Sequence, residues 1–309
     1  MFQSTLACVC LVAAGSLVAQ APTAPTAPTT PTPTPALKQV ELTFGVYATD
    51  LPTVVYRQFL PMLEVVQGEL TTSLGCPSSV ELRIFKTYEA ALDALVEGTV
   101  DFVRFGPSSY LLAKERKPEI SLLAMEDNDG EKIFQGVIAV RANSPIKTLA
   151  DLRGRKFAFG DENSTIGRYL AQLQLVNAGI AASDLAGHAF LGRHDKVFTA
   201  VEVGDFDAGA VKENTFDKMN KKGTLRELVR FNNVTKPWVA RAGLDPRVAA
   251  GLSRVLLGLK DGSKLKDVGI TGFRAVKDTD YDSIRAAMLA AEKFTAPKQG
   301  KPARPAPGK

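Results

Sequence analysis

Two pairs of neighbouring hydroxyl side chains could bind a small oxyanion. Ser164 and Thr165 stand between an apolar strand pattern and a helical pattern, while Ser108 and Ser109 follow a Gly-Pro turn that opens another helical pattern. The first N–H groups of a helix have no intrahelical partner and carry partial positive charge, so they attract anions. Hydroxyls add donors without adding charge. We therefore expect both pairs to bind an oxyanion; the alternative for each pair is that a hydroxyl only caps its helix.

Strand and helix patterns alternate around both pairs. In the first half of the chain, Val40–Val46 reads as a strand and is followed by a long helical pattern. The apolar face of that helix comprises Val55, Phe59, Leu63, Val66 and Leu70. In the second half, strand patterns at 137–140 and 157–160 precede the Ser164 helix. This alternation predicts an α/β fold made of βαβ units.

The order of residues between 137 and 167 resembles that of a known family. A strand is followed by a Ser-Pro-Ile turn, an Asp-Leu-Arg-Gly segment and the second hydroxyl pair. The matching positions are Ser144, Pro145, Ile146, Asp151, Leu152, Arg153, Gly154, Ser164, Thr165 and Gly167. The stretch resembles the second lobe of the phosphate-, phosphite- and phosphonate-binding proteins, which are the solute-binding components of ABC importers. Ile166 stands where that family usually has a second Ser, so one hydroxyl donor is missing.

The resemblance extends over about residues 38–294. The matching motifs in the first half of the chain are Tyr88 at a helix start, a turn from Gly98 to Asp101, and the run Phe105–Tyr110. The resemblance implies an α/β fold with two lobes joined by hinge crossings, the type II periplasmic binding protein fold. It also implies that Tyr47 and Tyr88 shield the ligand from water.

The expected organisation has five parts. They are a signal peptide at 1–21, a Pro/Thr-rich disordered linker at 22–37, a first lobe at 38–130 and 238–294, a second lobe at 131–237, and a basic disordered tail at 295–309. The helical patterns after position 246 are expected to pack on the first lobe.

Four further residues modify the expected site. The resemblance implies that His194, at a helix start, faces the cleft and donates to the ligand. Asp195 either fixes the tautomer of His194 or favours the helix N-terminus electrostatically. Arg193 replaces a Ser of the family. Arg104 stands where the family has a small or apolar residue, and it either points to solvent, stabilises its lobe, or adds a cation to the pocket.

Two positions bear on the charge of the ligand. Members of the family that bind aminoalkylphosphonates resemble one another in carrying acids for the ligand amine, and the alignment places Asn214 and Lys236 there. Glu213 is adjacent to the first position, so a shift of one residue in the alignment would restore an acid. If both acids are lost, the expected ligand is purely anionic: phosphite, phosphate or an unsubstituted phosphonate. The substitutions also leave open a different small anion, or none.

The N-terminal segment has the composition of an exported leader. Met1–Ala19 contains no charged residue and carries an apolar run, which predicts a secretory signal and a periplasmic or other extracytoplasmic location. Cys8 and Cys10 lie inside it, so a mature chain would keep only Cys76 and form no internal disulfide. The Pro/Thr repeat that follows predicts an extended tether.

The positive charge of the chain is concentrated at its C-terminal end. Four of the net five positive charges are accounted for by Lys298, Lys301, Arg304 and Lys309. No basic stripe with interleaved aromatic residues occurs elsewhere in the sequence, so a nucleic-acid partner is not expected.

The sequence carries no pattern typical of a catalytic or metal site. It has only two histidines, no Cys-x-x-Cys, no P-loop and no Gly-x-Ser-x-Gly elbow. We therefore expect a protein that is not an enzyme, has no metal or cofactor, acts as a monomer, and passes a small oxyanion to the membrane permease of an ABC importer. The alternatives are an extracytoplasmic sensory receptor that signals to a membrane partner and, less favoured, an enzyme on the same fold.

Overall fold

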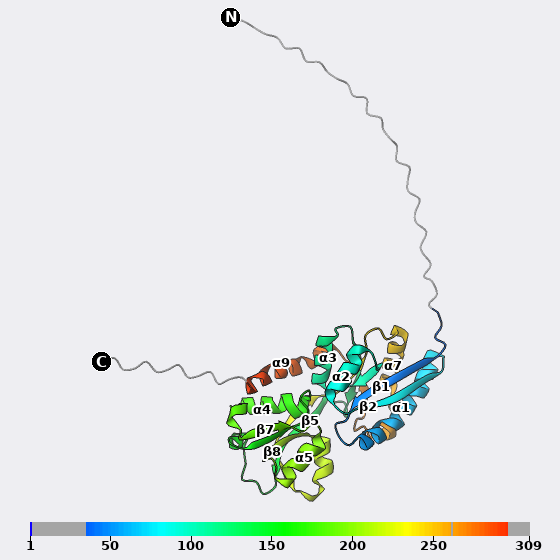
Figure 1. The fold of residues 1–309 in the computed structure, drawn as a ribbon. Coiled ribbons are helices and arrows are strands. Elements are labelled where there is room, and N and C mark those ends of the chain that lie inside the picture. Colours follow the sequence, from blue (N-terminus) through cyan, green and yellow to red (C-terminus); the bar gives the residue numbers. More distant parts are fainter. Residues whose placement is uncertain (2–34, 261, 296–309) are drawn as a thin grey trace, which may run out of the picture. The chain divides into compact units, whose positions relative to one another are not determined.

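The computed structural model describes Met1, residues 35–260 and residues 262–295. The expected signal peptide, nearly all of the linker and nearly all of the basic tail lie outside these residues. The chain divides into two units, Met1–Ala36 and Leu37–Lys309. Every described helix and strand belongs to the second unit, and only this unit is considered below (Figure 1).

This unit has two halves in space, each built on one sheet. The first half contains the early strands and also strands from the end of the chain, and its six-stranded sheet has the order β11-β4-β10-β3-β1-β2. The strands are β1 Val40–Tyr47, β2 Ser78–Phe85, β3 Phe102–Arg104, β4 Ser121–Asp127, β10 Pro237–Ala240 and β11 Gly272–Arg274. Strand β1, next to the edge strand β2, is parallel to β2 and β3, whereas β10 is antiparallel to β3 and β4. The parallel part follows from the βαβ pattern of the sequence.

The helices of the first half bury the faces that the apolar spacing predicts. They are α1 Pro52–Leu74, α2 Tyr88–Glu97, α3 Pro107–Arg116, α7 Pro246–Gly258 and the short α8 Gly262–Leu265. Helix α1 buries all five residues of its predicted apolar face and packs against α7. Pro107 occupies the first turn of α3, where its missing N–H removes no helical hydrogen bond.

The second half is built on a five-stranded sheet with the order β7-β6-β8-β5-β9. The strands are β5 Ile133–Arg141, β6 Lys156–Phe159, β7 Gly187–Phe190, β8 Ala208–Lys212 and β9 Leu225–Val234. The helices are a π-helix, Thr165–Leu170, continued by α4 Ala171–Asn177, together with α5 His194–Val203 and α6 Glu213–Met219. Short 3-10 helices occur at Leu149–Leu152, Ala182–Asp184, Asn220–Lys222, Asp278–Tyr281 and Glu292–Phe294.

Two crossings connect the sheets and lie side by side. The first runs from β4 to β5, and the second runs from β9 to β10 through Thr235 and Lys236. Backbone hydrogen bonds join them, from Thr235 N to Lys132 O at 3.0 Å and from Glu126 N to Lys236 O at 3.0 Å. The expected α/β fold with hinge crossings is therefore observed.

One large apolar cluster contains residues from both halves. Tyr47 and Phe105 of the first half belong to it together with Phe157, Phe159 and Ile166 of the second. A separate cluster lies under α1 and α7 and includes Trp238, which stacks on Phe44 with ring centroids 4.6 Å apart. The shared cluster means that the two halves are closed on each other in this structure.

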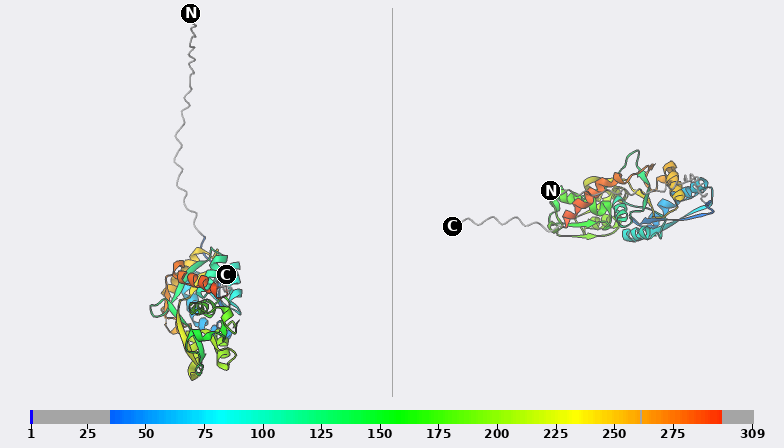
Figure 2. Two further views of the ribbon diagram at one scale, coloured as in Figure 1. Left: turned by 90° about the vertical axis from the view of Figure 1, so that its left-hand side faces the viewer. Right: turned by 90° about the horizontal axis from the view of Figure 1, so that it is seen from above.

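The last helix does not pack as the sequence analysis expected. Helix α9 (Asp282–Ala291) contacts α4 and the π-helix of the second half, as well as α3 of the first. The ring of Phe294 just beyond it lies 5.4 Å from that of Phe159. Figure 2 shows this red segment over the green second half. The apolar side of α9 is thus used to cover both halves, and assigning residues 238–294 wholly to the first lobe was wrong for this helix.

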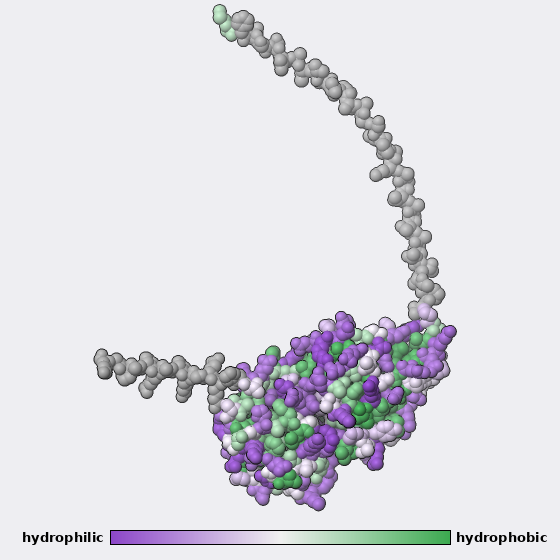
Figure 3. Space-filling view, viewed as in Figure 1, coloured by the Kyte–Doolittle hydropathy of each residue, from purple (hydrophilic) through white to green (hydrophobic). Residues whose placement is uncertain are grey.

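Hydrophilic side chains dominate the face drawn in Figure 3, where apolar residues form small separate groups. Among the described helices, none combines the length and the apolar character needed to cross a lipid bilayer.

Candidate functional site

The two hydroxyl pairs meet across the interface between the halves. Ser108 N donates to Thr165 Oγ1 at 2.9 Å, and the two side-chain oxygens lie 2.8 Å apart. Ser108 Oγ also donates to the carbonyl of Asn163 at 2.7 Å. All four predicted hydroxyl residues, Ser109 and Ser164 included, are buried. The α3 N-terminus of one half therefore faces the start of the π-helix of the other.

Ser164 is the N-cap of the π-helix. Its Oγ accepts from Gly167 N at 2.9 Å, as the capping alternative predicted for this residue. The same side chain hydrogen-bonds Tyr88. Thr165 lacks such a local capping bond in the described contacts, and its hydroxyl points instead to α3. The two neighbours thus differ in that only Ser164 caps its helix, while both contact residues of the first half.

Tyr47 and Tyr88 stack with their ring centroids 3.6 Å apart. Tyr47 Oη accepts from Gly106 N and lies 3.3 Å from Ser109 Oγ. Burial raises the pKa of Tyr47 to about 12 and that of Tyr88 well above its ordinary value. Both phenols therefore stay protonated at neutral pH and keep a donor for an anion.

A small cavity of about 20 Å³ lies between these groups, which is room for about one water molecule. Its lining includes Thr165, both tyrosines, Ile166, His194, Asn233 and Lys236. Two of the lining side chains carry buried polar atoms without a hydrogen-bond partner, namely His194 Nδ1 and both terminal atoms of Asn233. Unpartnered buried polar atoms are costly, so these positions suit a polar guest.

His194 lies at the start of α5, as expected, and is buried. Burial and the Lys212 ammonium lower the pKa of its ring to about 3, although Asp50 and the Ala210 backbone oppose this shift. His194 is therefore neutral at physiological pH. Its backbone N–H donates to Thr49 O of the first half at 3.2 Å.

Asp195 pairs with Arg193, with Nε to Oδ1 at 2.9 Å and Nη2 to Oδ2 at 3.0 Å. This carboxylate lies in the first turn of α5, which fits the electrostatic alternative rather than a bond that fixes the tautomer of His194. Arg193, expected as a departure from the family, is held away from the small cavity by the same pair.

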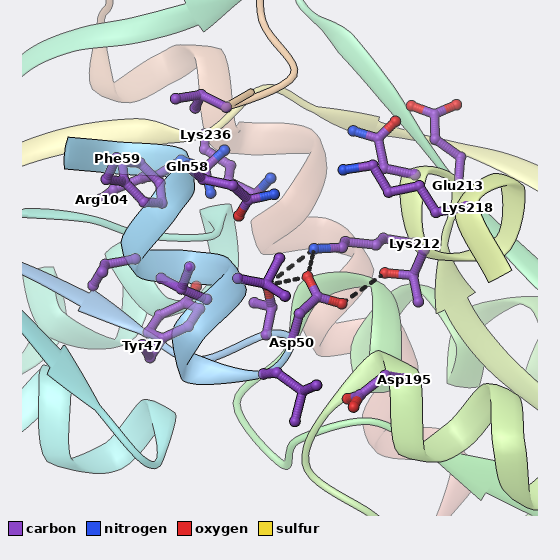
Figure 4. A pocket seen from close by; sticks show the side chains of 18 of the residues that line it. Tyr47, Asp50, Gln58, Phe59, Arg104, Asp195, Lys212, Glu213, Lys218 and Lys236 are labelled. Carbon is purple, nitrogen blue, oxygen red and sulfur yellow. Dashed lines mark hydrogen bonds and ion pairs between the residues drawn. The ribbon is translucent and has the colours of Figure 1, made fainter. Parts of the chain in front are cut away.

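A cross-cleft ion pair joins Lys212, at the end of β8, to Asp50 after β1 (Figure 4). Lys212 Nζ also donates to Thr49 Oγ1 at 3.0 Å, and Thr215 Oγ1 donates to Asp50 Oδ1 at 3.2 Å. Burial alone would raise the pKa of Asp50, but Lys212 lowers it to about 2. Asp50 is therefore ionised at neutral pH, and its contact with Lys212 joins the two halves.

Arg104 stabilises its own half of the molecule. Its Nη2 donates to Glu126 Oε2 at 3.0 Å, its Nε pairs with the other oxygen, and its guanidinium lies 5.2 Å from the Phe59 ring centre. Glu126 also accepts from Trp238 Nε1 at 3.2 Å. With only 11% of its side chain exposed, Arg104 does not point to solvent. Arg104 also lines a cavity of the cleft. It therefore stabilises its own lobe and also places a cation at the pocket, two of the three expected alternatives.

A larger cavity of about 300 Å³ adjoins the small one and shares with it Tyr47, Thr49, Phe134, Lys212 and Lys236. Burial and nearby Arg104 lower the pKa of Lys236 to about 7, against the opposing effect of Glu126. Asn214 is exposed and lines this larger cavity rather than the small one. Asn214 therefore does not line the small cavity that Ser164 and Thr165 line.

Sequence reasoning missed Asn233 and the Asp50–Lys212 pair. Asn233 lies near the end of β9, a strand that we did not identify. The signal that could have found it is the spacing of apolar residues in Leu225–Val234, which partly alternates with polar ones. Asp50 and Lys212 are 162 positions apart, and nothing local connects them.

The two α/β halves with paired crossings and a polar cleft define a type II periplasmic binding protein. Residues 44–281 match the family described as ABC transporter, phosphonate, periplasmic substrate-binding protein. This match covers more than half of the chain, and the chain belongs to that family.

Relatives of known name agree with this assignment. The chain is 32% identical over 183 residues to a probable ABC transporter phosphite binding protein, PhnD1, of Prochlorococcus marinus, covering 55% of this chain and 61% of the relative. It is 26% identical over 260 residues to the phosphate-import protein PhnD of Mycolicibacterium smegmatis, covering 74% and 78%. A solved structure of the Prochlorococcus PhnD1 in complex with methylphosphonate shares the fold, with a TM-score of 0.71, 24% identity, and coverage of 82% and 98%.

The described residues contain no group of three or more His, Cys, Asp or Glu side chains that could hold a metal ion. The relatives named above are binding components of transporters rather than enzymes.

Proposed function

We propose that the cleft captures a small phosphorus oxyanion, phosphonate, phosphite or phosphate, outside the cytoplasm and delivers it to the membrane permease of an ABC importer. The observation that carries the proposal is the meeting of Ser108 and Thr165 from opposite halves, beside the unpartnered side-chain amide of Asn233. The two named relatives, a phosphite binding protein and a phosphate-import protein, support the same ligand class.

The bound anion would lie in the small cavity and draw donors from both halves. The hydroxyls of Ser164, Thr165 and the two tyrosines, with Asn233, provide five donor groups among the residues that line this cavity. The space of about 20 Å³ is smaller than a tetrahedral anion requires, so the contact between Ser108 and Thr165 would lengthen as the ligand enters. Each hydroxyl would exchange a protein partner for an anionic oxygen.

The energies are sufficient for tight binding. A hydrogen bond to a charged group contributes about 1.5 to 3 kcal/mol, while micromolar affinity corresponds to about 8 kcal/mol net. Four or five such bonds meet that requirement after the cost of separating and reclosing the halves. Closure around the ligand would present a composite surface to the permease.

The test is calorimetric titration of the purified chain with phosphate, phosphite, methylphosphonate, 2-aminoethylphosphonate and sulfate. We expect Thr165→Ala to weaken the best anion at least about tenfold, since it removes a hydroxyl shared between the halves, without unfolding the chain. Thr72→Ala, on an exposed part of α1, is the matched control and should bind as the wild type does.

An unchanged affinity in Thr165→Ala would remove Thr165 from the proposed site. Absence of binding to every anion tested would overturn the proposed function. The sensory alternative receives no support from the relatives, both of which are named as transport proteins.

A further inference from the structure

We propose that the cleft selects a phosphonate whose organic substituent ends in a second acidic group, such as a carboxylate, and that Lys236 is the residue that selects it. This inference rests on the proposed function, because the phosphonate end is assigned to the small cavity. It assigns the adjoining larger cavity to the substituent.

The larger cavity has the size and lining of a substituent pocket. Its volume of about 300 Å³ falls in the range of small-molecule sites, and a hydrogen or methyl substituent would leave most of it unfilled. Apolar side chains supply much of its wall, among them Val55, Phe59 and Phe134. A short methylene chain would therefore be buried against apolar surface, while its far end would reach the charged part of the lining.

Every carboxylate that lines this cavity is already paired with a cation. Asp50 pairs with Lys212, Asp195 with Arg193, and Glu213 with Arg230 at 3.2 Å. Each pair satisfies its acid within the protein. A ligand ammonium would have to displace one of these cations, so the lining disfavours aminoalkyl substituents.

Lys236, in contrast, is a cation of the lining that is not paired with an acid among the described residues. Within residues 35–260 and 262–295, its ammonium has no ion pair and no hydrogen bond, and its contact is with the face of Phe134, 4.3 Å from the ring centre. It lines both cavities, and Figure 4 shows it among the side chains around the larger one. Arg104 and Lys212 line the same space, but each is paired with a carboxylate, Glu126 and Asp50 respectively, whereas Lys236 is not paired within the described part of the chain.

The unpaired ammonium of Lys236 has a direct chemical consequence. An ammonium withdrawn from water without a counter-ion is unfavourable, and an anionic group brought beside it relieves that cost. A carboxylate on the ligand would supply the missing charge, whereas an ammonium would be repelled. Lys236 is well placed for this because its backbone is fixed in the second crossing by the bond from Glu126 N.

Two isosteric ligand pairs isolate the charge of the substituent. In calorimetric titrations at pH 6.5, 3-phosphonopropionate is compared with 3-methylbutylphosphonate, and 2-aminoethylphosphonate is compared with propylphosphonate. We expect the carboxylate to bind at least about tenfold tighter than its uncharged isostere, and the ammonium to bind weaker than its own. Because these comparisons use the wild-type chain, they need no variant to fold.

Three variants connect the preference to the residue. Lys236→Met should reduce the preference for 3-phosphonopropionate over 3-methylbutylphosphonate to within about twofold. Lys236→Asp should reverse the order within the ammonium pair. Lys196→Met, on the exposed face of α5, is the matched control and should keep the preference. Thermal unfolding confirms that each variant is folded.

Equal affinity of the wild type for both members of the carboxylate pair would overturn this inference, as would a full preference in folded Lys236→Met. If methylphosphonate or phosphate binds while the carboxylate gives no gain, only this inference fails. If none of the phosphonates, phosphate or phosphite binds, the proposed function fails first.

Discussion

At the scale of single residues, His194 makes the stability of the protein depend on pH. Its pKa is lowered to about 3 by burial and by Lys212, while Asp50 opposes the shift and Lys236 adds to it. The unfolded chain takes up a proton below about pH 6.5, but the folded chain does not. The folded state is therefore fully favoured above pH 6.5 and loses stability as the pH falls toward 3.

We expect the free energy of unfolding of the wild type, measured with urea from pH 7.5 to pH 4, to fall by about 1.4 kcal/mol per pH unit below pH 6.5 on account of His194. His194→Gln should flatten this part of the curve. His188→Gln changes an exposed ring and should retain the slope. The same slope in all three proteins would show that His194 is protonated in the folded state.

The sequence predicted those residues of the candidate site whose positions are set by neighbouring residues along the chain. The hydroxyls at Ser108 and Thr165 were identified because each opens a helix, a feature visible in neighbouring residues. Asn233 and Asp50 were missed because their positions depend on contacts between distant segments. Lys236 was noticed only as a replaced acid, and its lack of a counter-ion needed the structure.

At the scale of elements, the junction between β6 and the π-helix requires two glycines. A Cβ on Gly167 would lie 2.7 Å from Gly160 Cα, closer than side-chain carbons approach backbone atoms. The approach is fixed by the bond from Gly160 N to Gly167 O at 2.8 Å. This close contact places Ser164 and Thr165 at the cleft.

We expect Gly167→Ala to destabilise the protein by about 1 to 3 kcal/mol, because the backbone must separate to admit the methyl group. Gly68→Ala is the matched control. It lies inside α1 with open space around it and should stabilise by about 0.5 to 1 kcal/mol. Urea unfolding measures both, and equal effects of the two substitutions would contradict the assigned role of the junction.

Elements with strong periodicity were predicted well, and those set by long-range packing were not. The buried face of α1 followed directly from its spacing, and Gly98 ends α2 in the left-handed conformation as its position suggested. Strand β9 was missed, and α9 was expected on the first half alone although it contacts both halves. The amphipathic pattern of α9 shows that one face is buried, but it does not say against which neighbour.

At the scale of the whole molecule, the Asp50–Lys212 pair links the two halves. Its side chains are 17% and 16% exposed, so it is only partly screened by water. We expect Asp50→Asn to disfavour the closed arrangement by about 1 to 3 kcal/mol, because Lys212 is left without its counter-charge. Small-angle X-ray scattering should then give a larger radius of gyration.

Asp195→Asn is the control for this prediction, since Asp195 pairs with Arg193 within its own half. Its scattering should match the wild type. If Asp50→Asn also scatters like the wild type, the pair does not hold the halves closed. The α/β class was predicted from the alternation of strand and helix patterns, and the hinge crossings from the resemblance to the family. The degree of closure depends on such contacts between halves and could not be predicted.

The single tryptophan of the chain sits where the two halves join. Trp238 is fully buried on Phe44, donates to Glu126, and lies in β10, two positions after Lys236 of the second crossing. Its indole therefore has one environment, dry and aromatic, that any bending of this connection disturbs. The protein carries its own optical probe: emission excited at the indole band comes from the joint alone and reports its movement without a label.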